Sequence, residues 1–160
     1  DYHFNTGNTF REDLGTAVGS WLNKIGVAVT QNGVTWEQFL TLLFDDVDDL
    51  GVFAIGWGPD YLDPFNMIDP LFNPVSGSNS GQVDNATLND KLGYALNTTD
   101  PVARIGVYHD LQEILIKGYF HAPLYHSKVV SVHLANIYGV QYNAMGSLRI
   151  YPMYRGLFPS

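Results

Sequence analysis

Cysteine is absent from the chain, which excludes disulfide bonds and thiol chemistry from its 160 residues. Basic residues are also few, because 8 Lys and Arg stand against 16 Asp and Glu, and the net charge is −8. A surface of this sign repels a phosphate backbone, so nucleic acid is excluded as a partner. No apolar run approaches the roughly 20 residues of a transmembrane helix, and no signal segment opens the chain.

The signatures of several enzyme classes are missing as well. The sequence has no Gly-x-Ser-x-Gly elbow, no phosphate loop and no dinucleotide fingerprint, and its 5 His lack metal-ligand spacing. The acidic run 45–49 resembles part of a calcium loop, but Leu50 and Trp57 stand where oxygen ligands are needed. We therefore expect a solvated helix end there, and no metal or cofactor elsewhere.

The composition that remains is typical of a folded domain, with 46% hydrophobic and only 15% charged residues. Helical periodicity alternates with short β-branched runs, which predicts an α/β or α+β fold with a mixed sheet flanked by helices. The expected strands are Tyr2–Phe4, Val27–Thr30 and Val52–Ile55. The expected helices begin after Asn8 or Thr9, after Thr35, at Pro64, near Leu88 and after Asp100.

Local signals mark where several of these elements begin and end. Thr35 and Gln38 form a capping box at the start of the second helix, and Gly33 predicts a turn just before it. Gly26 is expected to end the first helix. The apolar stripe of that first helix, expected to pack on the sheet, is Leu14, Val18, Trp21, Leu22 and Ile25.

The rest of the chain is organised around the segment from Val52 to Phe65. Its first four residues are uniformly apolar, which predicts a strand buried on both faces. Gly56, Gly58 and Pro59 then end the strand, and Asp60 follows between the aromatic residues Trp57 and Tyr61. Ligands of open α/β sheets bind beyond the carboxyl ends of strands, so this segment is a candidate binding site; a capped turn is the simpler alternative.

The run Gly-Trp-Gly-Pro-Asp-Tyr-Leu-Asp-Pro at 56–64 resembles the signature segment of solute-binding proteins of peptide-type (dipeptide, oligopeptide or nickel) ABC importers. Segments 1–26, 29–39, 98–115, 123–126 and 138–140 resemble the same family in the same order. The resemblance implies a class II periplasmic-binding-protein fold of two lobes. It further implies that residues 1–127 are part of the second lobe, and that residues 128–160 are an extended tail returning to a first lobe that precedes this portion.

The same resemblance implies a binding site and its partners. Asp60 matches the residue that pairs with the peptide α-amino group, Trp57 and Tyr61 would line the pocket beside Gly58, and Asp63 is expected to cap a helix. The implied partner is an ABC permease. The implied location is extracytoplasmic, with a membrane anchor at the missing N-terminus. Relatives bind sugars or metal chelates, so the ligand class stays open.

Two other functional classes compete with a solute binder. A glycoside-hydrolase-like enzyme would use Asp60 and Asp63 as a carboxylate pair with His126, but no further motif supports it. A non-catalytic adhesive or assembly module would use the tyrosine-rich tail as an interaction strand that pairs with another copy of the chain. We rank the binder first, the assembly module second and the enzyme third.

Overall fold

The structure is a computed structural model that describes residues 1–125, 128 and 130–157. Its N-terminal part is a three-stranded sheet in the order β2-β1-β3, and both strand pairs are parallel. The α/β class is as expected, while the strand pairs of this sheet in the described residues are parallel, because a helix connects each strand to the next and such crossovers leave strands parallel. The elements are β1 (Tyr2–Asn5), α1 (Thr9–Asn23), β2 (Gln31–Val34), α2 (Trp36–Phe44), the 3-10 helix η1 (Val47–Asp49) and β3 (Val52–Phe53).

Strand β2 begins four residues later than the sequence predicts. The backbone N–H of Tyr2 donates to the carbonyl of Thr30, and pairing then runs from Tyr2 opposite Gln31 to Asn5 opposite Val34. The β-branched run 27–30 is thus a connection, and Gly33 lies within the strand rather than in a turn. Pairing with β1 decides the register here, because β propensity mainly reflects packing rather than backbone preference.

Strand β3 is shorter and more exposed than predicted. It covers two residues instead of four, and Val52 at its start is 48% exposed. The strand buried on both faces is β1, which is central in the sheet and carries buried Tyr2, His3 and Phe4. A strand at the edge of a sheet has a neighbour on one side only, so its apolar residues are covered incompletely.

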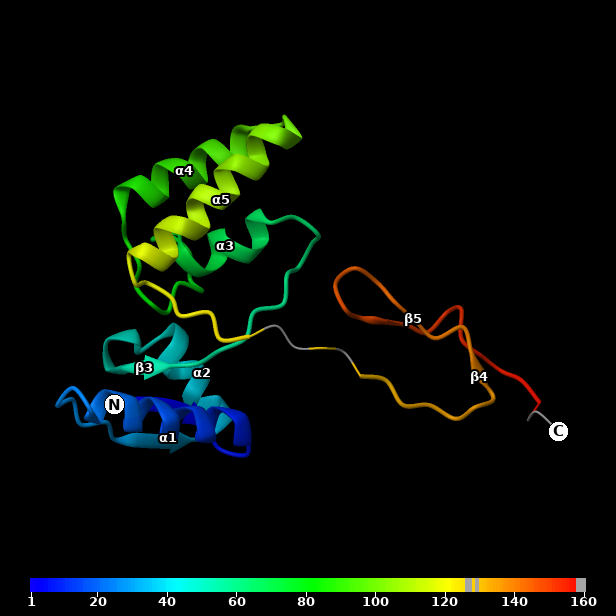
Figure 1. The fold of residues 1–160 in the computed structure, drawn as a ribbon, viewed down its shortest axis with the longest axis horizontal. Helices are drawn as coiled ribbons and strands as arrows, with labels where there is room; N and C mark the ends of the chain where they lie inside the picture. The colour runs from blue at the N-terminus through cyan, green and yellow to red at the C-terminus, as the bar shows by residue number, and fades with distance from the viewer. Residues whose placement is uncertain (126–127, 129, 158–160) are drawn as a thin grey trace.

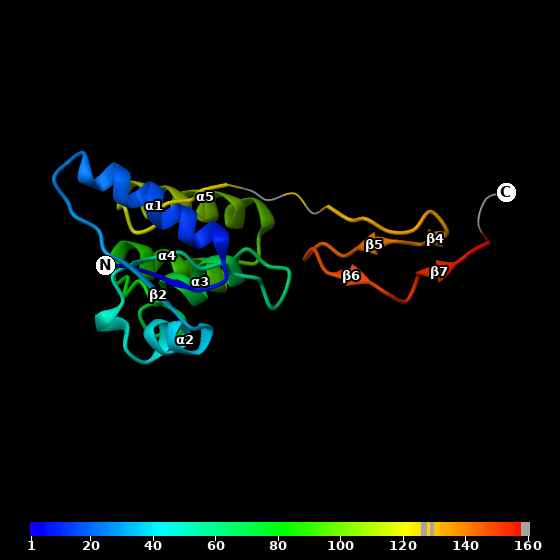
Figure 2. The same ribbon diagram turned by 90° about the horizontal axis from the view of Figure 1, so that it is seen from below.

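Helices α1 and α2 lie on opposite sides of this sheet (Figure 2). The predicted end of α1 is confirmed: Gly26 has a φ of +83°, and the N–H of Val27 donates to the carbonyl of Leu22. The capping box of Thr35 with Gln38 at the start of α2 is also confirmed. The stripe of α1 is only partly covered, because Trp21 and Ile25 are exposed.

The helices α3 (Phe65–Phe72), α4 (Ala86–Asn97) and α5 (Pro101–Lys117) form a second unit above the sheet (Figure 1). Asp100 caps α5 and Pro101 is its first residue, as predicted. No helix in the described part of the chain has the length and apolarity needed to cross a membrane. The core of this unit consists of Ile68, Phe72, Val83, Leu88, Leu92, Ala95, Val107, Tyr108, Leu111 and Leu115.

The C-terminal tail is extended, as expected, and lies apart from both units in Figures 1 and 2. It contains two antiparallel ladders of very short strands. The predicted boundary between residues 127 and 128 stays a prediction, since residues 126, 127 and 129 lie outside the described residues. The ladders pair β4 (Ile137–Tyr138) with β7 (Tyr154–Arg155), and β5 (Gln141–Tyr142) with β6 (Leu148–Arg149).

Candidate functional site

The segment 54–64 is the link that runs from the sheet into the helical unit. It begins after β3, at the edge where the carboxyl ends of all three parallel strands lie. It ends at Pro64, the N-cap of α3. The predicted site residues are therefore at the edge of the sheet where ligands of parallel α/β proteins bind.

A single buried side chain of α3 holds the middle of this segment. Asn66 is 5% exposed, and its Oδ1 accepts a hydrogen bond of 2.6 Å from the backbone N–H of Asp60. Its backbone carbonyl accepts a second bond, of 2.7 Å, from the indole N–H of Trp57. Asn66 thus fixes two of the predicted site residues against the first turn of α3.

The predicted site residues differ in exposure. The indole of Trp57 is partly buried by its contact with Asn66, whereas Asp60 is exposed and Tyr61 is 50% exposed. Gly58 has no positive φ and has open space around its Cβ position, so no contact within the chain requires glycine there. The arrangement presents a carboxylate and a phenol to solvent from an anchored backbone.

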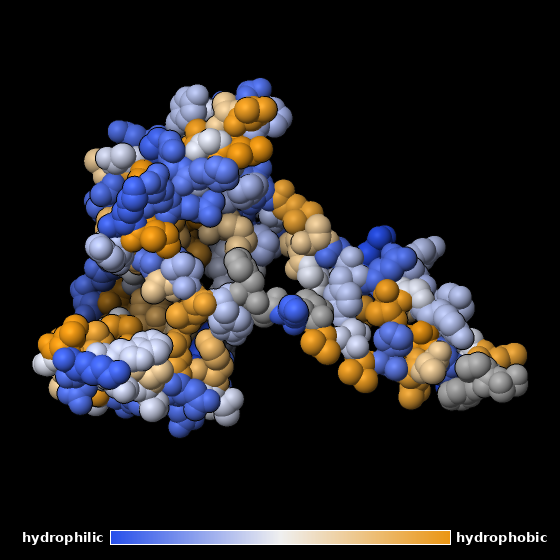
Figure 3. Space-filling view, in the orientation of Figure 1, coloured by the Kyte–Doolittle hydropathy of each residue, from blue (hydrophilic) through white to orange (hydrophobic). Residues whose placement is uncertain are grey.

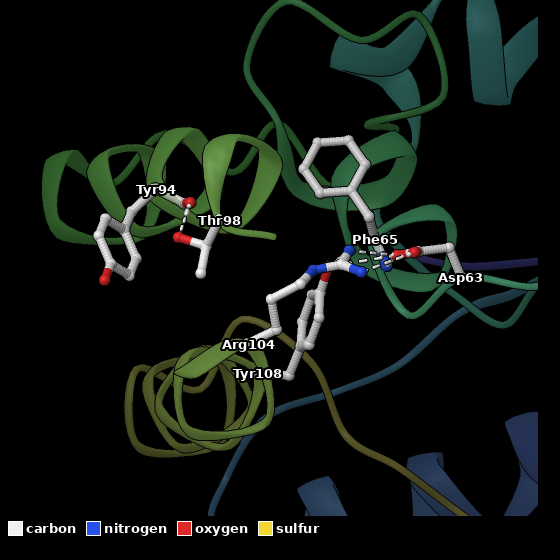
Figure 4. Close-up of polar contacts among 6 residues, drawn as sticks. All are labelled: Asp63, Phe65, Tyr94, Thr98, Arg104 and Tyr108. Atoms are coloured by element: carbon white, nitrogen blue, oxygen red, sulfur yellow. Dashed lines mark hydrogen bonds and ion pairs between the residues drawn. The ribbon is translucent and has the colours of Figure 1, made fainter. Parts of the chain in front are cut away.

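Asp63, at the end of the segment, is the centre of a polar cluster (Figure 4). Arg104 of α5 donates from Nη1 to Asp63 Oδ2 at 3.0 Å and from Nη2 to Oδ1 at 2.8 Å. The same Nη2 lies 2.7 Å from the hydroxyl of Tyr108, which in turn donates to Asp63 Oδ1 at 3.3 Å. The backbone N–H of Phe65 also donates to Oδ1, at 2.8 Å, so Asp63 bonds to the first residue of α3, although the N-cap position itself is Pro64 and not Asp63 as predicted.

The hydrogen bonds of this cluster determine the charge of Asp63. The hydrogen bonds from Arg104 hold the pKa of Asp63 below its ordinary value, and burial raises the pKa of Tyr108. Asp63 is therefore ionised and fully engaged at neutral pH. A carboxylate whose two oxygens are already bonded is a poor general acid, which disfavours the carboxylate pair of the enzyme hypothesis. His126, the third residue of that hypothesis, lies outside the described residues.

Sequence reasoning identified neither Asn66 nor the pair Arg104 and Tyr108. One signal was available for the pair. Arg104 and Tyr108 precede Leu111 by seven and three residues, so the arginine shares the buried face of α5. An arginine on an apolar helix face needs an anionic partner, and Asp63 is that partner. Asn66 carries no comparable signal, because its role depends on a turn formed by another segment.

Two open surface grooves lie away from the predicted residues. One, of about 520 Å³, lies between α4 and the end of α5 and is lined by Lys91, Asp110 and Phe120 among others. The second, of about 320 Å³, lies between β3 and the loop around Gln82. The described residues contain no group of three acidic or histidine side chains placed to hold a metal ion.

The amino-acid sequence matches no protein-family model and no curated protein. Solved structures do resemble the fold. Clavulanic acid biosynthesis oligopeptide binding protein 2 matches 98% of this chain with a TM-score of 0.81 at 20% identity. The ABC transporter-associated periplasmic binding protein DppA from Helicobacter pylori, in complex with the peptide STSA, matches 96% with a TM-score of 0.80 at 20% identity.

A third similar structure is the dipeptide binding protein from Pseudoalteromonas sp. SM9913 in complex with Met-Leu, with 90% of this chain covered, a TM-score of 0.71 and 24% identity. The chain spans 30%, 30% and 29% of these three structures, respectively. The fold predicted from the sequence resemblance is therefore confirmed: this chain has an α/β fold similar to part of the fold of class II periplasmic binding proteins.

Proposed function

We propose that this chain belongs to an extracytoplasmic solute-binding protein of an ABC importer, and that its segment 54–64 binds the α-amino group of a peptide. The observation that carries the proposal is the exposed carboxylate of Asp60, presented by an anchored backbone at the carboxyl edge of a parallel sheet. Similar structures with bound peptides support the ligand class.

The chemistry of the segment fits an ammonium ligand. A carboxylate forms a charge-assisted hydrogen bond with an ammonium group, and the bond strengthens when a closed cleft excludes water. Trp57 and Tyr61 flank Asp60 in the sequence and offer aromatic surface to the first side chain of a peptide, while Gly58 leaves room for close approach of its backbone. Asp63 takes no part in binding, since Arg104 occupies it.

The experiment compares free and N-acetylated peptides on the protein at its full natural length. Tripeptides, free or N-acetylated, are first screened for those that raise the midpoint of thermal unfolding of the protein. Calorimetry then measures the affinity of the peptide that raises it most. Asp60→Ala should weaken binding of the free peptide by about 2 kcal/mol, the low end of the range for truncating one partner of a charge pair. Equal affinity for free and acetylated peptides would exclude Asp60 as the amine ligand.

The remaining roles follow from the same proposal. The protein delivers its ligand to a membrane permease, is held at the membrane through a segment outside this chain, and carries out no catalysis. Turnover of a peptide or glycoside that Asp60→Asn abolishes would contradict the last point. A permease partner is tested by uptake of a labelled peptide in cells that carry the wild-type protein or Asp60→Ala.

A separate observation favours self-association through the tail as a second property. All 16 acidic residues lie within residues 1–127, whereas residues 128–160 contain three of the 8 basic residues and no acidic one. The tail also exposes apolar side chains, seen as orange patches in Figure 3. The most exposed of these are Val130, Val132, Ile150 and Leu157, and the ring of Tyr151 is exposed as well. A basic, apolar strand pair complements the acidic surface of a second copy.

Light scattering on this chain tests that property. We expect a dimer that dissociates as salt concentration rises, and a monomer when the chain is cut after residue 127. A strictly monomeric chain at high protein concentration and low salt would exclude self-association without affecting the proposed peptide site.

A further inference from the structure

The segment that carries Asp60 is fastened to the helical unit at two points. Asn66 holds its middle through the Asp60 amide, and Arg104 holds its end through Asp63, three residues further on. These two attachments belong to different helices, α3 and α5. The direction in which the segment presents Asp60 and Tyr61 therefore depends on where α5 places its guanidinium.

We infer that Arg104 is a positioning residue for the Asp60 site, which sets the affinity for a ligand amine by holding Asp63 without touching the ligand. The inference rests on the proposed function. Both terminal nitrogens of Arg104 bond to Asp63, and one also bonds to Tyr108. The guanidinium carbon lies 5.3 Å from the centroid of the Tyr108 ring. Arg104 thus commits both terminal nitrogens to Asp63, and its Nε is buried, so a ligand does not reach the guanidinium nitrogens.

The bidentate geometry explains why arginine suits this role. Two parallel N–H···O bonds fix both the distance and the rotation of the Asp63 carboxylate, whereas a lysine ammonium fixes the distance alone. The third and fourth bonds, from Tyr108 and the Phe65 amide, leave the carboxylate one orientation. Only two residues separate Asp60 from Asp63, and the Asp63 N–H donates to the carbonyl of Tyr61 at 2.9 Å, so a displacement of the Asp63 backbone is passed on to Asp60.

The helical core includes Tyr108, which bonds to both members of this pair, but nine other buried residues complete the core. Ten buried apolar residues hold α3, α4 and α5 together, and the Asp63 and Arg104 side chains are each 27% exposed at its margin. A second ion pair provides a matched control. Lys91 of α4 and Asp110 of α5 are 2.6 Å apart and join the same helical unit, and in the described residues neither side chain forms a hydrogen bond with segment 54–64.

The test measures the ratio of dissociation constants for an N-acetylated and a free tripeptide, selected from the screen above, on the full-length protein. This ratio reports the contribution of Asp60 to amine binding. Arg104→Lys should lower the ratio by about tenfold, because the charge remains but the carboxylate can rotate. Lys91→Gln should leave the ratio unchanged. Asp63→Asn, which keeps the side-chain size, should lower the ratio to a similar extent. It serves as the second variant in case Arg104→Lys folds poorly.

Each result decides one question. A wild-type ratio near one overturns the proposed peptide site itself. A large wild-type ratio that Arg104→Lys and Asp63→Asn both preserve overturns the positioning role while the peptide site stands. Equal weakening of both peptides in these variants, together with a lower unfolding midpoint, assigns the pair to folding alone and also overturns the inference.

Discussion

The helical unit and the sheet unit have similar chain lengths but bury their apolar residues to different extents. The helices share one cluster of ten buried residues, whereas the buried cluster around α2 has three, Phe39, Leu43 and Leu50. Both units leave apolar side chains at the surface, such as Trp21 and Val102, so the difference lies in the size of the buried clusters. The candidate site is fastened to the better packed unit by Asn66 and Arg104, so a rigid support carries the segment that meets the ligand.

The largest expected change in stability comes from truncating a side chain in the helical core. Leu88→Ala removes a fully buried side chain and should lower the free energy of unfolding by about 3 kcal/mol through lost contacts and a cavity. Leu96 lies on the same helix but is 65% exposed, so Leu96→Ala should change stability by less than about 0.5 kcal/mol. Urea unfolding of the two variants measures the difference; equal losses would show that α4 does not pack as described.

A second pair of substitutions compares two glycines of α1. A Cβ at position 15 would lie 2.5 Å from the ring of buried Tyr2, so Gly15→Ala should cost about 2 kcal/mol by overpacking. At position 19 the nearest side-chain atom, from Val29, is at an ordinary 3.7 Å. Gly19→Ala should therefore stabilise the helix by about 0.5 kcal/mol. Midpoints of thermal unfolding that shift in the same direction for both variants would contradict the close packing of α1 on β1.

A smaller effect concerns the anchor of the site. Asn66→Ala removes the acceptor of the Asp60 N–H, and we expect the free energy of unfolding to fall by about 1 kcal/mol. The loss is small because Asp60 is exposed and water can replace the lost partner. Amide hydrogen exchange should accelerate at Asp60 while the amides of α5 keep their protection. Unchanged exchange at Asp60 would mean that another group holds the segment.

The smallest expected effect is a dependence on pH. The pKa of Asp63 is lowered in the folded state by Arg104, from an ordinary value of 3.8. The ionised group therefore stabilises the fold above about pH 4, and this contribution is lost as pH falls through the lowered pKa. The stability difference between wild type and Asp63→Asn should be constant near neutrality and shrink in acid. A difference that grows in acid would contradict the assigned direction.

Patterns that act within one element were predicted well from the sequence. The capping box at Thr35, the end of α1 at Gly26 and the start of α5 at Pro101 all depend on residues a few positions apart. The position of β2 was missed because its register is set by Tyr2 and Asn5, far away in the chain. The apolar run at Val52 predicted a buried strand, but its place at the sheet edge leaves it exposed.

The sequence by itself determined the α/β class, the positions of the helices and the segment that carries Asp60, because caps, breakers and periodicity are local interactions. Only the tertiary structure decided that Asp63 meets Arg104, 41 residues away, and that Asn66 holds the Asp60 amide. Hydrogen-bonding groups of a turn can be satisfied by many partners or by water. Which partner is used depends on how α3 and α5 pack, and that packing is a property of the whole fold.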